Sequence, residues 1–270
     1  MSQGLNRAER LAALRAQVKK IEGLAAAGGA AFMPLGVDAV DARIAGGGLA
    51  VRALHEVAAA SPDLADDAAA TLFLAALAGR KAHAQEDGNG GGDAGGGDVL
   101  WALSRRDLFA PGLALAGLPP DRLLYAECRD DAEVLAVMEE GLRHGGLAAV
   151  IGEVGRCAMG PARRLQLAAE EGGTMALMLR RWKKAARDPL AEPSPAVTRW
   201  RLGCAPSAPL PLAATGPVAG IGRACWRVEL ARQRGGEPAT WILEAPDAEA
   251  RLALFSAPAD RADLAGRRAA

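Results

Sequence analysis

The chain has 270 residues, half of them hydrophobic, with 32 basic and 32 acidic side chains and a formal net charge of zero. This length allows one large domain with extensions or two small ones. The zero net charge excludes a global field that would steer the protein to nucleic acid or to a membrane. The four cysteines form no C-x-x-C pair, so their spacing suggests neither a zinc site nor a disulfide framework.

The sequence also shows no sign of a membrane segment. No apolar run reaches the about 20 residues that span a bilayer, and the N-terminus lacks a signal-peptide core. We therefore expect a soluble cytoplasmic protein with free thiols.

The first predicted element is an amphipathic helix, which we assign to residues 1–29. Apolar side chains spaced by three and four run from Asn6 to Ala27, with Lys and Arg on the other face, and Gly28 follows as a helix stop. The pattern leaves open whether the apolar face packs on its own domain or on a partner. A short extended segment at 32–37 and a glycine turn at 46–48 then lead into the first strand.

The stretch from Leu54 to Gly79 predicts a strand, a turn and a helix where a nucleotide-binding fold would hold phosphates. Ser61 is the expected helix N-cap, with Pro62 at the first helical position and the helix over 65–78. A phosphate loop needs glycines, a lysine and a Ser/Thr hydroxyl. The chain has no glycine between residues 48 and 79 and no lysine between 20 and 81.

Carboxylates take the place of the missing phosphate ligands. Asp63, Asp66 and Asp67 lie at or near the start of the helix, where negative side chains complement the helix dipole that a phosphate would otherwise use. We therefore expect no nucleotide cofactor here.

The remaining elements predict an α/β fold with a mostly parallel twisted sheet flanked by helices. Apolar strands are expected at 99–103, 122–126, 147–154 and 174–179, separated by helices at 111–116, 130–143 and 161–172. A flexible glycine-rich loop is expected at 85–98. Alternating segments at 197–202, 224–230 and 240–244 predict an antiparallel meander that extends one edge of the sheet near the C-terminus. A polar tail is expected at 246–270.

Residues 30–245 resemble the core of RecA recombinases. Ile44 to Leu49 followed by Leu54 to Val57 is similar to the turn and strand that precede the phosphate loop. Three parts of an ATPase site are missing or displaced. The phosphate loop is absent, Gly152-Glu153 stands where an NTPase keeps an Asp for magnesium, and no acid follows Leu103 until Asp107. We therefore expect a pseudo-ATPase without catalytic, cofactor-binding or metal-binding residues.

Five stretches closely resemble the ImuA family of inducible-mutagenesis accessory proteins. These stretches are Gly46 to Leu49, His55 to Val57, Val99 to Trp101, Arg163 to Glu170 and Trp226 to Arg232. The resemblance implies a role in the SOS response, as an adaptor in DNA repair by translesion synthesis. The implied partners are an ImuB-like inactive Y-family polymerase homologue and an error-prone C-family DNA polymerase, with nucleoid association after damage. The resemblance leaves open whether the protein also contacts RecA or DNA and whether it forms a homo-oligomer.

Basic residues after two strands are the candidate contacts with DNA or a partner. They occupy positions resembling the two DNA-binding loops of recombinases, where a Trp could stack on a base while cations hold phosphates. The residues are Arg163, Arg164, Arg180, Arg181, Trp182, Lys183, Lys184 and Arg187. The alternative is a solvated helix face with a structural Trp. His55 is isolated in a buried strand, and we interpret it as a hydrogen-bonded core residue.

Two other functions remain compatible with the sequence. A SulA-type cell-division inhibitor would also resemble RecA without its ATPase site. A DNA-binding ATPase with an unusual nucleotide site, completed by a neighbouring subunit, is the other alternative.

Overall fold

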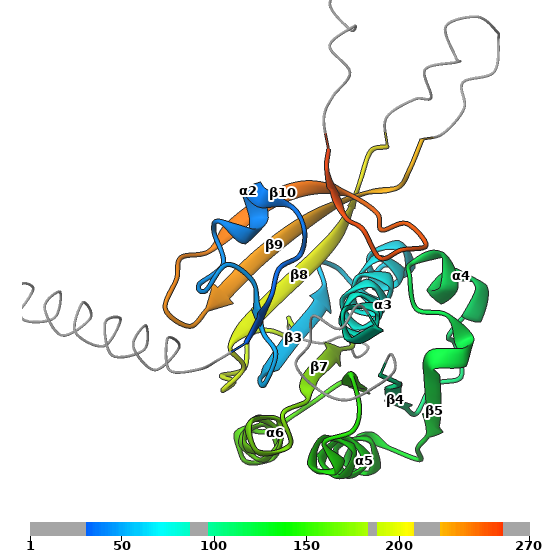
Figure 1. Ribbon diagram of the computed structural model, residues 1–270, viewed down its shortest axis with the longest axis vertical. Coiled ribbons are helices and arrows are strands. Elements are labelled where there is room, and N and C mark those ends of the chain that lie inside the picture. The colour runs from blue at the N-terminus through cyan, green and yellow to red at the C-terminus, as the bar shows by residue number, and fades with distance from the viewer. Residues whose placement is uncertain (1–30, 87–96, 183–187, 208–221, 256–270) are drawn as a thin grey trace, which may run out of the picture.

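The computed structural model describes residues 31–86, 97–182, 188–207 and 222–255. In this part of the chain, nine strands form one mixed sheet with helices on both faces (Figure 1). The predicted fold class, α/β with a mostly parallel sheet extended by antiparallel strands, is confirmed. The predicted helix within residues 1–29 lies outside the described residues.

The strands of the large sheet follow an order in which the first strand of the α/β core lies in the middle. In space they are β11 (Ala253–Leu254), β10 (Ala239–Glu244), β9 (Cys225–Gln233), β8 (Thr198–Ala205), β3 (Leu54–Ala59), β7 (Met175–Arg180), β6 (Ala149–Val154), β4 (Val99–Leu103) and β5 (Leu123–Glu127). The five pairings from β8 to β5 are parallel, and the three from β8 to β11 are antiparallel. The predicted meander therefore begins with β8, a strand parallel to β3.

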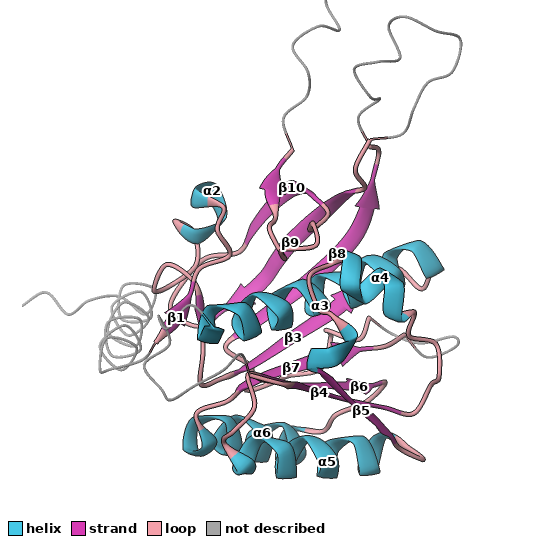
Figure 2. Cartoon of the chain, turned by 45° about the vertical axis from the view of Figure 1, so that its right-hand side comes forward, coloured by secondary structure: helices cyan, strands magenta, loops and turns pink. Residues whose placement is uncertain are grey.

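Helices cover the sheet in two layers (Figure 2). One face carries α3 (Leu64–Glu86) and α4 (Ala110–Leu115), and the other carries α5 (Asp131–His144) and α6 (Met159–Gly172). A two-stranded sheet of β1 (Phe32–Met33) and β2 (Leu49–Ala50), the short helix α2 (Asp38–Asp41) and the 3-10 turn η1 (Pro120–Arg122) complete the described elements.

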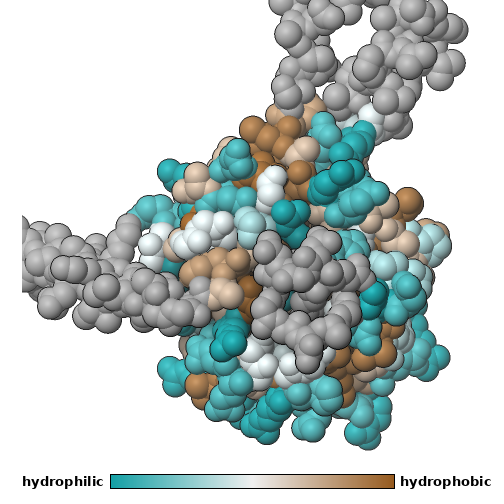
Figure 3. Space-filling view, in the orientation of Figure 1, coloured by the Kyte–Doolittle hydropathy of each residue, from teal (hydrophilic) through white to brown (hydrophobic). Residues whose placement is uncertain are grey.

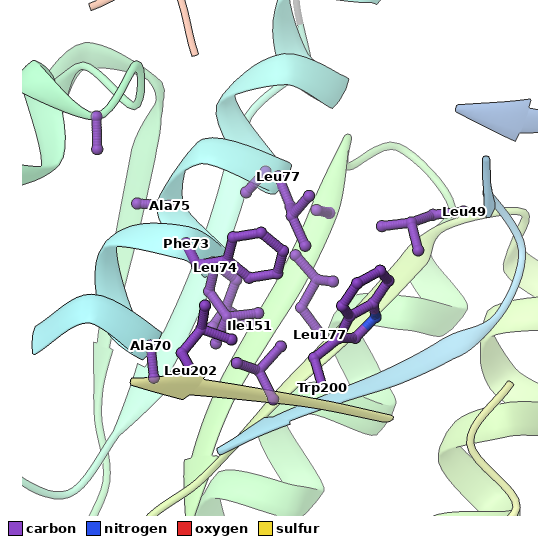
Figure 4. Close-up of a cluster of buried hydrophobic side chains, with 14 of the residues drawn as sticks. Leu49, Ala70, Phe73, Leu74, Ala75, Leu77, Ile151, Leu177, Trp200 and Leu202 are labelled. Atoms are coloured by element: carbon purple, nitrogen blue, oxygen red, sulfur yellow. The ribbon is translucent and has the colours of Figure 1, made fainter. Parts of the chain in front are cut away.

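The main hydrophobic core lies between α3 and the sheet (Figure 4). Every residue of β3, β6 and β7 is buried, as expected for parallel strands covered on both faces. Phe73 of α3 packs on Trp200 of β8 with ring centroids 5.8 Å apart. The Trp200 indole N–H donates to the Thr198 hydroxyl at 2.7 Å, so the large ring is buried without an unpaired donor.

Glycines at two close approaches explain local features that sequence patterns do not show. A Cβ on Gly79 would lie 2.1 Å from the Gly117 carbonyl oxygen, so α3 passes this backbone at a distance that only glycine allows. The helix therefore continues through Gly79 to Glu86, beyond the end expected at Ala78 and into the loop expected at 85–98. On the other face, a Cβ on Gly152 would lie 2.1 Å from the Met138 sulfur.

The start of α3 also differs from the expected N-cap. The helix begins at Leu64 instead of at Pro62. Ser61 still bonds the first turn, because its hydroxyl accepts the Asp63 backbone N–H at 3.2 Å and donates to the Asp66 carboxylate at 2.7 Å. At the other end of the chain, β11 pairs with β10, so the sheet extends past the core boundary expected at residue 245.

His55 is a core residue, as the sequence predicts. Its ring is fully buried in β3, with Nδ1 2.7 Å from the Thr198 hydroxyl and Nε2 2.9 Å from the Ala50 carbonyl oxygen. Burial disfavours the charged imidazolium, and the bond to Ala50 only partly offsets this. The pKa of His55 is lowered from 6.5 to about 4.

This shift predicts that the protein loses stability on mild acidification. A lowered pKa in the folded state stabilises the fold above pH 6.5, and this contribution is lost as the pH falls towards and through about 4. We expect the free energy of unfolding to decrease by about 3 kcal/mol over this range, measured by urea denaturation. His55→Gln should remove this part of the pH dependence. Equal slopes for both proteins would contradict the assignment.

Candidate functional site

The carboxyl ends of β3, β4, β6 and β7 meet the start of α3 at one edge of the sheet. In open α/β sheets ligands bind at this edge, and the phosphate loop of a nucleotide-binding fold would lie in the turn between β3 and α3. In this protein, charged side chains at the carboxyl ends of these strands pair with one another and with the start of α3. We call Asp67, Trp101, Glu153 and Arg181 the Arg181 cluster.

Arg181 lies at the centre of the cluster, directly after β7. Its Nε and Nη2 donate to one carboxylate oxygen of Glu153 at 2.9 and 2.7 Å, and its Nη1 donates to the carboxylate of Asp67. The other oxygen of Glu153 accepts the Trp101 indole N–H at 2.8 Å. Asp107 lies at the margin, 3.8 Å from Arg181 Nη2. One guanidinium thus joins β6, β7 and the first turn of α3.

The charges of Glu153 and Arg181 depend on each other because both side chains are buried. Glu153 is 3% exposed and Arg181 7% exposed. Burial lowers the pKa of Arg181, but attraction to Glu153 and to Asp67 outweighs it, so the pKa of the guanidinium is raised and its charge is secured. Burial raises the pKa of Glu153, and the bonds from Arg181 and Trp101 hold this rise back. Neither charge could remain buried without the other.

Of the other two carboxylates predicted at this turn, Asp66 is bonded within the protein and Asp63 faces solvent. One Asp66 oxygen accepts the Cys204 backbone N–H at 2.7 Å, and the other accepts the Ser61 hydroxyl. Asp66 therefore links the start of α3 to β8. Asp63 is exposed, and only its backbone N–H has a hydrogen bond to a side chain among the described residues.

A second buried ion cluster lies on the opposite face of the sheet, around Glu56 of β3. Its carboxylate accepts from Arg180 at 3.2 Å, from Arg199 at 2.7 Å and from the Ser194 hydroxyl at 2.8 Å. Glu56 is fully buried, and the two arginines are 1% and 6% exposed. This cluster ties the segment around Ser194 to β3, β7 and β8.

The structure separates the predicted basic residues into three groups. Arg163 and Arg164 are exposed on α6, where Arg164 pairs with Glu139 at 3.1 Å. Arg180 and Arg181 are buried in the two ion clusters and are not presented to solvent. Lys183, Lys184 and Arg187 lie outside the described residues. The predicted contact with DNA or a partner therefore depends, within the described chain, on the two arginines of α6.

Trp182 also has an internal role. It is half-buried against the main core, and its indole N–H donates to the Ala59 carbonyl oxygen at 2.9 Å. This bond links Trp182 to the end of β3.

Within residues 31–86, 97–182, 188–207 and 222–255, no group of three His, Cys, Asp or Glu side chains could hold a metal ion. None of the helices described there is long and apolar enough to cross a membrane.

A pocket of about 310 Å³ opens beside the Arg181 cluster, between the start of α3 and α4. We call it the α3–α4 pocket. Its lining residues are Leu64, Asp67, Ala68, Thr71, Leu72, Arg105, Asp107, Leu108, Phe109, Gly112, Leu113 and Arg181. Most of these side chains are apolar. Sequence reasoning missed this pocket, although Leu64 and Phe109, apolar residues beside helix starts, were a signal.

The fold and the site together define an α/β protein with a mostly parallel sheet, in which a buried ion cluster links the carboxyl ends of β6 and β7 to the start of α3. "Protein ImuA" of Caulobacter vibrioides strain NA1000 / CB15N is 36% identical to this chain over 220 residues, covering 80% of this chain and 84% of the relative. Protein ImuA of strain ATCC 19089 / CIP 103742 / CB 15 gives the same values. The chain belongs to the ImuA family, which confirms the predicted family and its link to SOS mutagenesis and the DNA damage response.

Two other comparisons add little. No protein-family model matches the chain. The crystal structure of SulA from Pseudomonas aeruginosa is 21% identical and matches 47% of this chain and 97% of that chain, with a TM-score of 0.37. This likeness is too low to carry an argument about fold or function.

The Arg181 cluster predicts a large loss of stability when its cation is removed. Arg181→Met leaves Glu153 buried beside Asp67 without a counter-charge, so we expect the free energy of unfolding to fall by about 3–5 kcal/mol in urea denaturation. Arg181→Met with Glu153→Gln should recover part of this loss, because the buried charge is then gone. The control Arg164→Met removes an exposed ion pair and should cost less than about 1 kcal/mol. Equal effects of both single substitutions would contradict the role of Arg181.

Proposed function

We propose that this protein is a non-catalytic adaptor in SOS mutagenesis, which helps to assemble an error-prone translesion polymerase complex with an ImuB-like protein. The single observation that carries the proposal is the Arg181 cluster. A nucleotide-binding site keeps its lysine and its magnesium carboxylates free for the ligand. Here the carboxylates of Asp67 and Glu153 are already neutralised by Arg181, within the chain.

The charges at the start of α3 support the same proposal. A phosphate at this helix N-terminus would meet the carboxylates of Asp63, Asp66 and Asp67. The described turn also has no glycine whose backbone could approach a phosphate closely. Binding of a nucleoside triphosphate here would therefore have to displace internal ion pairs and overcome like-charge repulsion. A pseudo-ATPase that acts through its surface fits these observations better.

The proposed partners are those that the resemblance to the ImuA family implies. On this proposal the ImuB-like inactive Y-family polymerase homologue binds the protein directly, and the error-prone C-family polymerase joins the same complex. Two segments outside the described residues, the N-terminal segment within 1–29 and the C-terminal residues after 255, are candidate docking elements. Among the predicted contact residues that the structure describes, Arg163 and Arg164 are the two that are exposed.

Co-purification tests this proposal. A tagged form of the protein, recovered from DNA-damaged cells, should carry the ImuB-like protein. Removal of residues 1–29 or of residues 256–270 should weaken this recovery if the removed segment docks the partner, while circular dichroism shows an intact fold. Recovery of a tubulin-like division protein instead of polymerase subunits would contradict the adaptor role and favour the SulA-type alternative.

A further inference from the structure

Two of the three most exposed large apolar side chains of the described residues line one pocket. Leu64 is 80% exposed, Phe109 71% and Leu115 69%. Leu64 begins α3, and the other two flank and end α4. Hydrophobic atoms come to the surface on the side of the molecule where α4 lies (Figure 3). Leu64 and Phe109 both line the α3–α4 pocket. Exposed apolar groups that gather around a pocket are typical of an interaction site.

The fold itself does not need these two side chains. Phe109 is the N-cap residue of α4, with extended backbone angles of φ −104° and ψ 98° and no side-chain cap hydrogen bond. Ser, Thr, Asp or Asn would bond the free N–H groups at this position, which Phe cannot do. Leu64 exposes most of its side chain to water at the first helical position of α3. Residues that act against local stability in this way are expected at functional positions.

The interior of the pocket favours an apolar occupant. Its apolar walls include Leu72, Leu108 and Leu113. Its charged groups are already balanced, because Arg181 pairs with Asp67 and Arg105 pairs with Asp107 at 2.7 Å. A charged ligand would have to break these pairs, whereas an uncharged side chain would not. The volume of about 310 Å³ lies at the lower end of the range for ligand pockets, which suits one or two side chains.

Gly112 keeps the pocket open. A Cβ at this residue of α4 would lie 3.3 Å from the Phe109 ring and 3.9 Å from the Leu72 side chain, so any larger side chain here would grow into the pocket. Glycine is a poor choice inside a helix, where it costs about 1 kcal/mol relative to alanine. Gly112 thus lowers the stability of α4 but leaves space in the pocket.

We propose that the α3–α4 pocket is the docking site for an apolar anchor side chain of a partner polypeptide, with a basic residue beside the anchor. The basic residue is inferred from charge complementarity. Asp63 adjoins Leu64 at the rim, and its carboxylate has no ion pair among the described residues. This inference rests on the proposed function, because it names the surface through which the adaptor binds the ImuB-like protein.

Substitutions at the pocket test this assignment directly. The purified full-length protein is titrated with the ImuB-like protein by calorimetry. Phe109→Ser, Leu64→Ser and Gly112→Leu should each weaken the affinity at least tenfold, the first two by removing apolar contacts and the third by filling the space. Asp63→Lys should weaken binding and reduce its dependence on salt. Leu167→Ser on α6 and Leu254→Ser in β11, which are 55% and 48% exposed, are matched controls and should bind as the wild type does.

Thermal melting separates a binding defect from a folding defect. Phe109→Ser adds an N-cap, so this variant should melt at or above the wild-type temperature. Loss of binding by a variant that is as stable as the wild type supports the pocket.

Three outcomes would overturn the inference, and they differ in what else they affect. If the wild type and all variants bind equally, the pocket assignment fails and the proposed function stands. If the wild type itself does not bind the ImuB-like protein, the proposed function fails, and the pocket inference with it. If the pocket variants retain binding but convert a self-associated wild type to monomers in size-exclusion chromatography, the occupant is a second copy of this chain instead of a partner.

Discussion

The buried ion pair of Arg181 with Glu153 is the interaction on which the functional edge of this protein depends. It joins the ends of β6 and β7, and through Asp67 it fixes the first turn of α3. A buried carboxylate and a buried guanidinium are each costly alone, so each residue requires the other. The position of the pair matters as much as its strength, because it lies at the carboxyl ends of the parallel strands, where ligands bind in open α/β sheets.

The sheet and helices could largely be predicted from sequence because burial determines them. The apolar runs of β3, β6 and β7 leave no polar face, and the helices between the parallel strands show the expected spacing. The extension of α3 through Gly79 could not be predicted, since the close approach of this glycine to Gly117 involves a residue far away in the sequence. The parallel pairing of β8 with β3 could not be predicted either, because an alternating pattern does not specify which strand will be the neighbour.

Only part of the candidate site could be predicted from the sequence. The missing phosphate loop was evident, since glycine and lysine are absent over a long stretch. The role of Arg181 was not, because the run from Arg180 to Lys184 has the composition of a surface patch. A signal did exist, however. Glu56 and Glu153 lie in mostly apolar strands, and a buried carboxylate demands a buried cation. Arg180 at the end of β7 and Arg181 directly after it meet this demand, one on each face of the sheet.

We propose that the protein does not use a nucleotide, because the carboxylates of Asp67 and Glu153 beside the start of α3 are already paired with Arg181. Equilibrium binding of labelled ATP with magnesium to the purified full-length protein tests this most directly. We expect no saturable binding by the wild type, with or without single-stranded DNA. Saturable binding of one ATP per chain, abolished by a substitution in the turn between Ala58 and Asp67, would contradict this proposal and show an unusual nucleotide site at that turn.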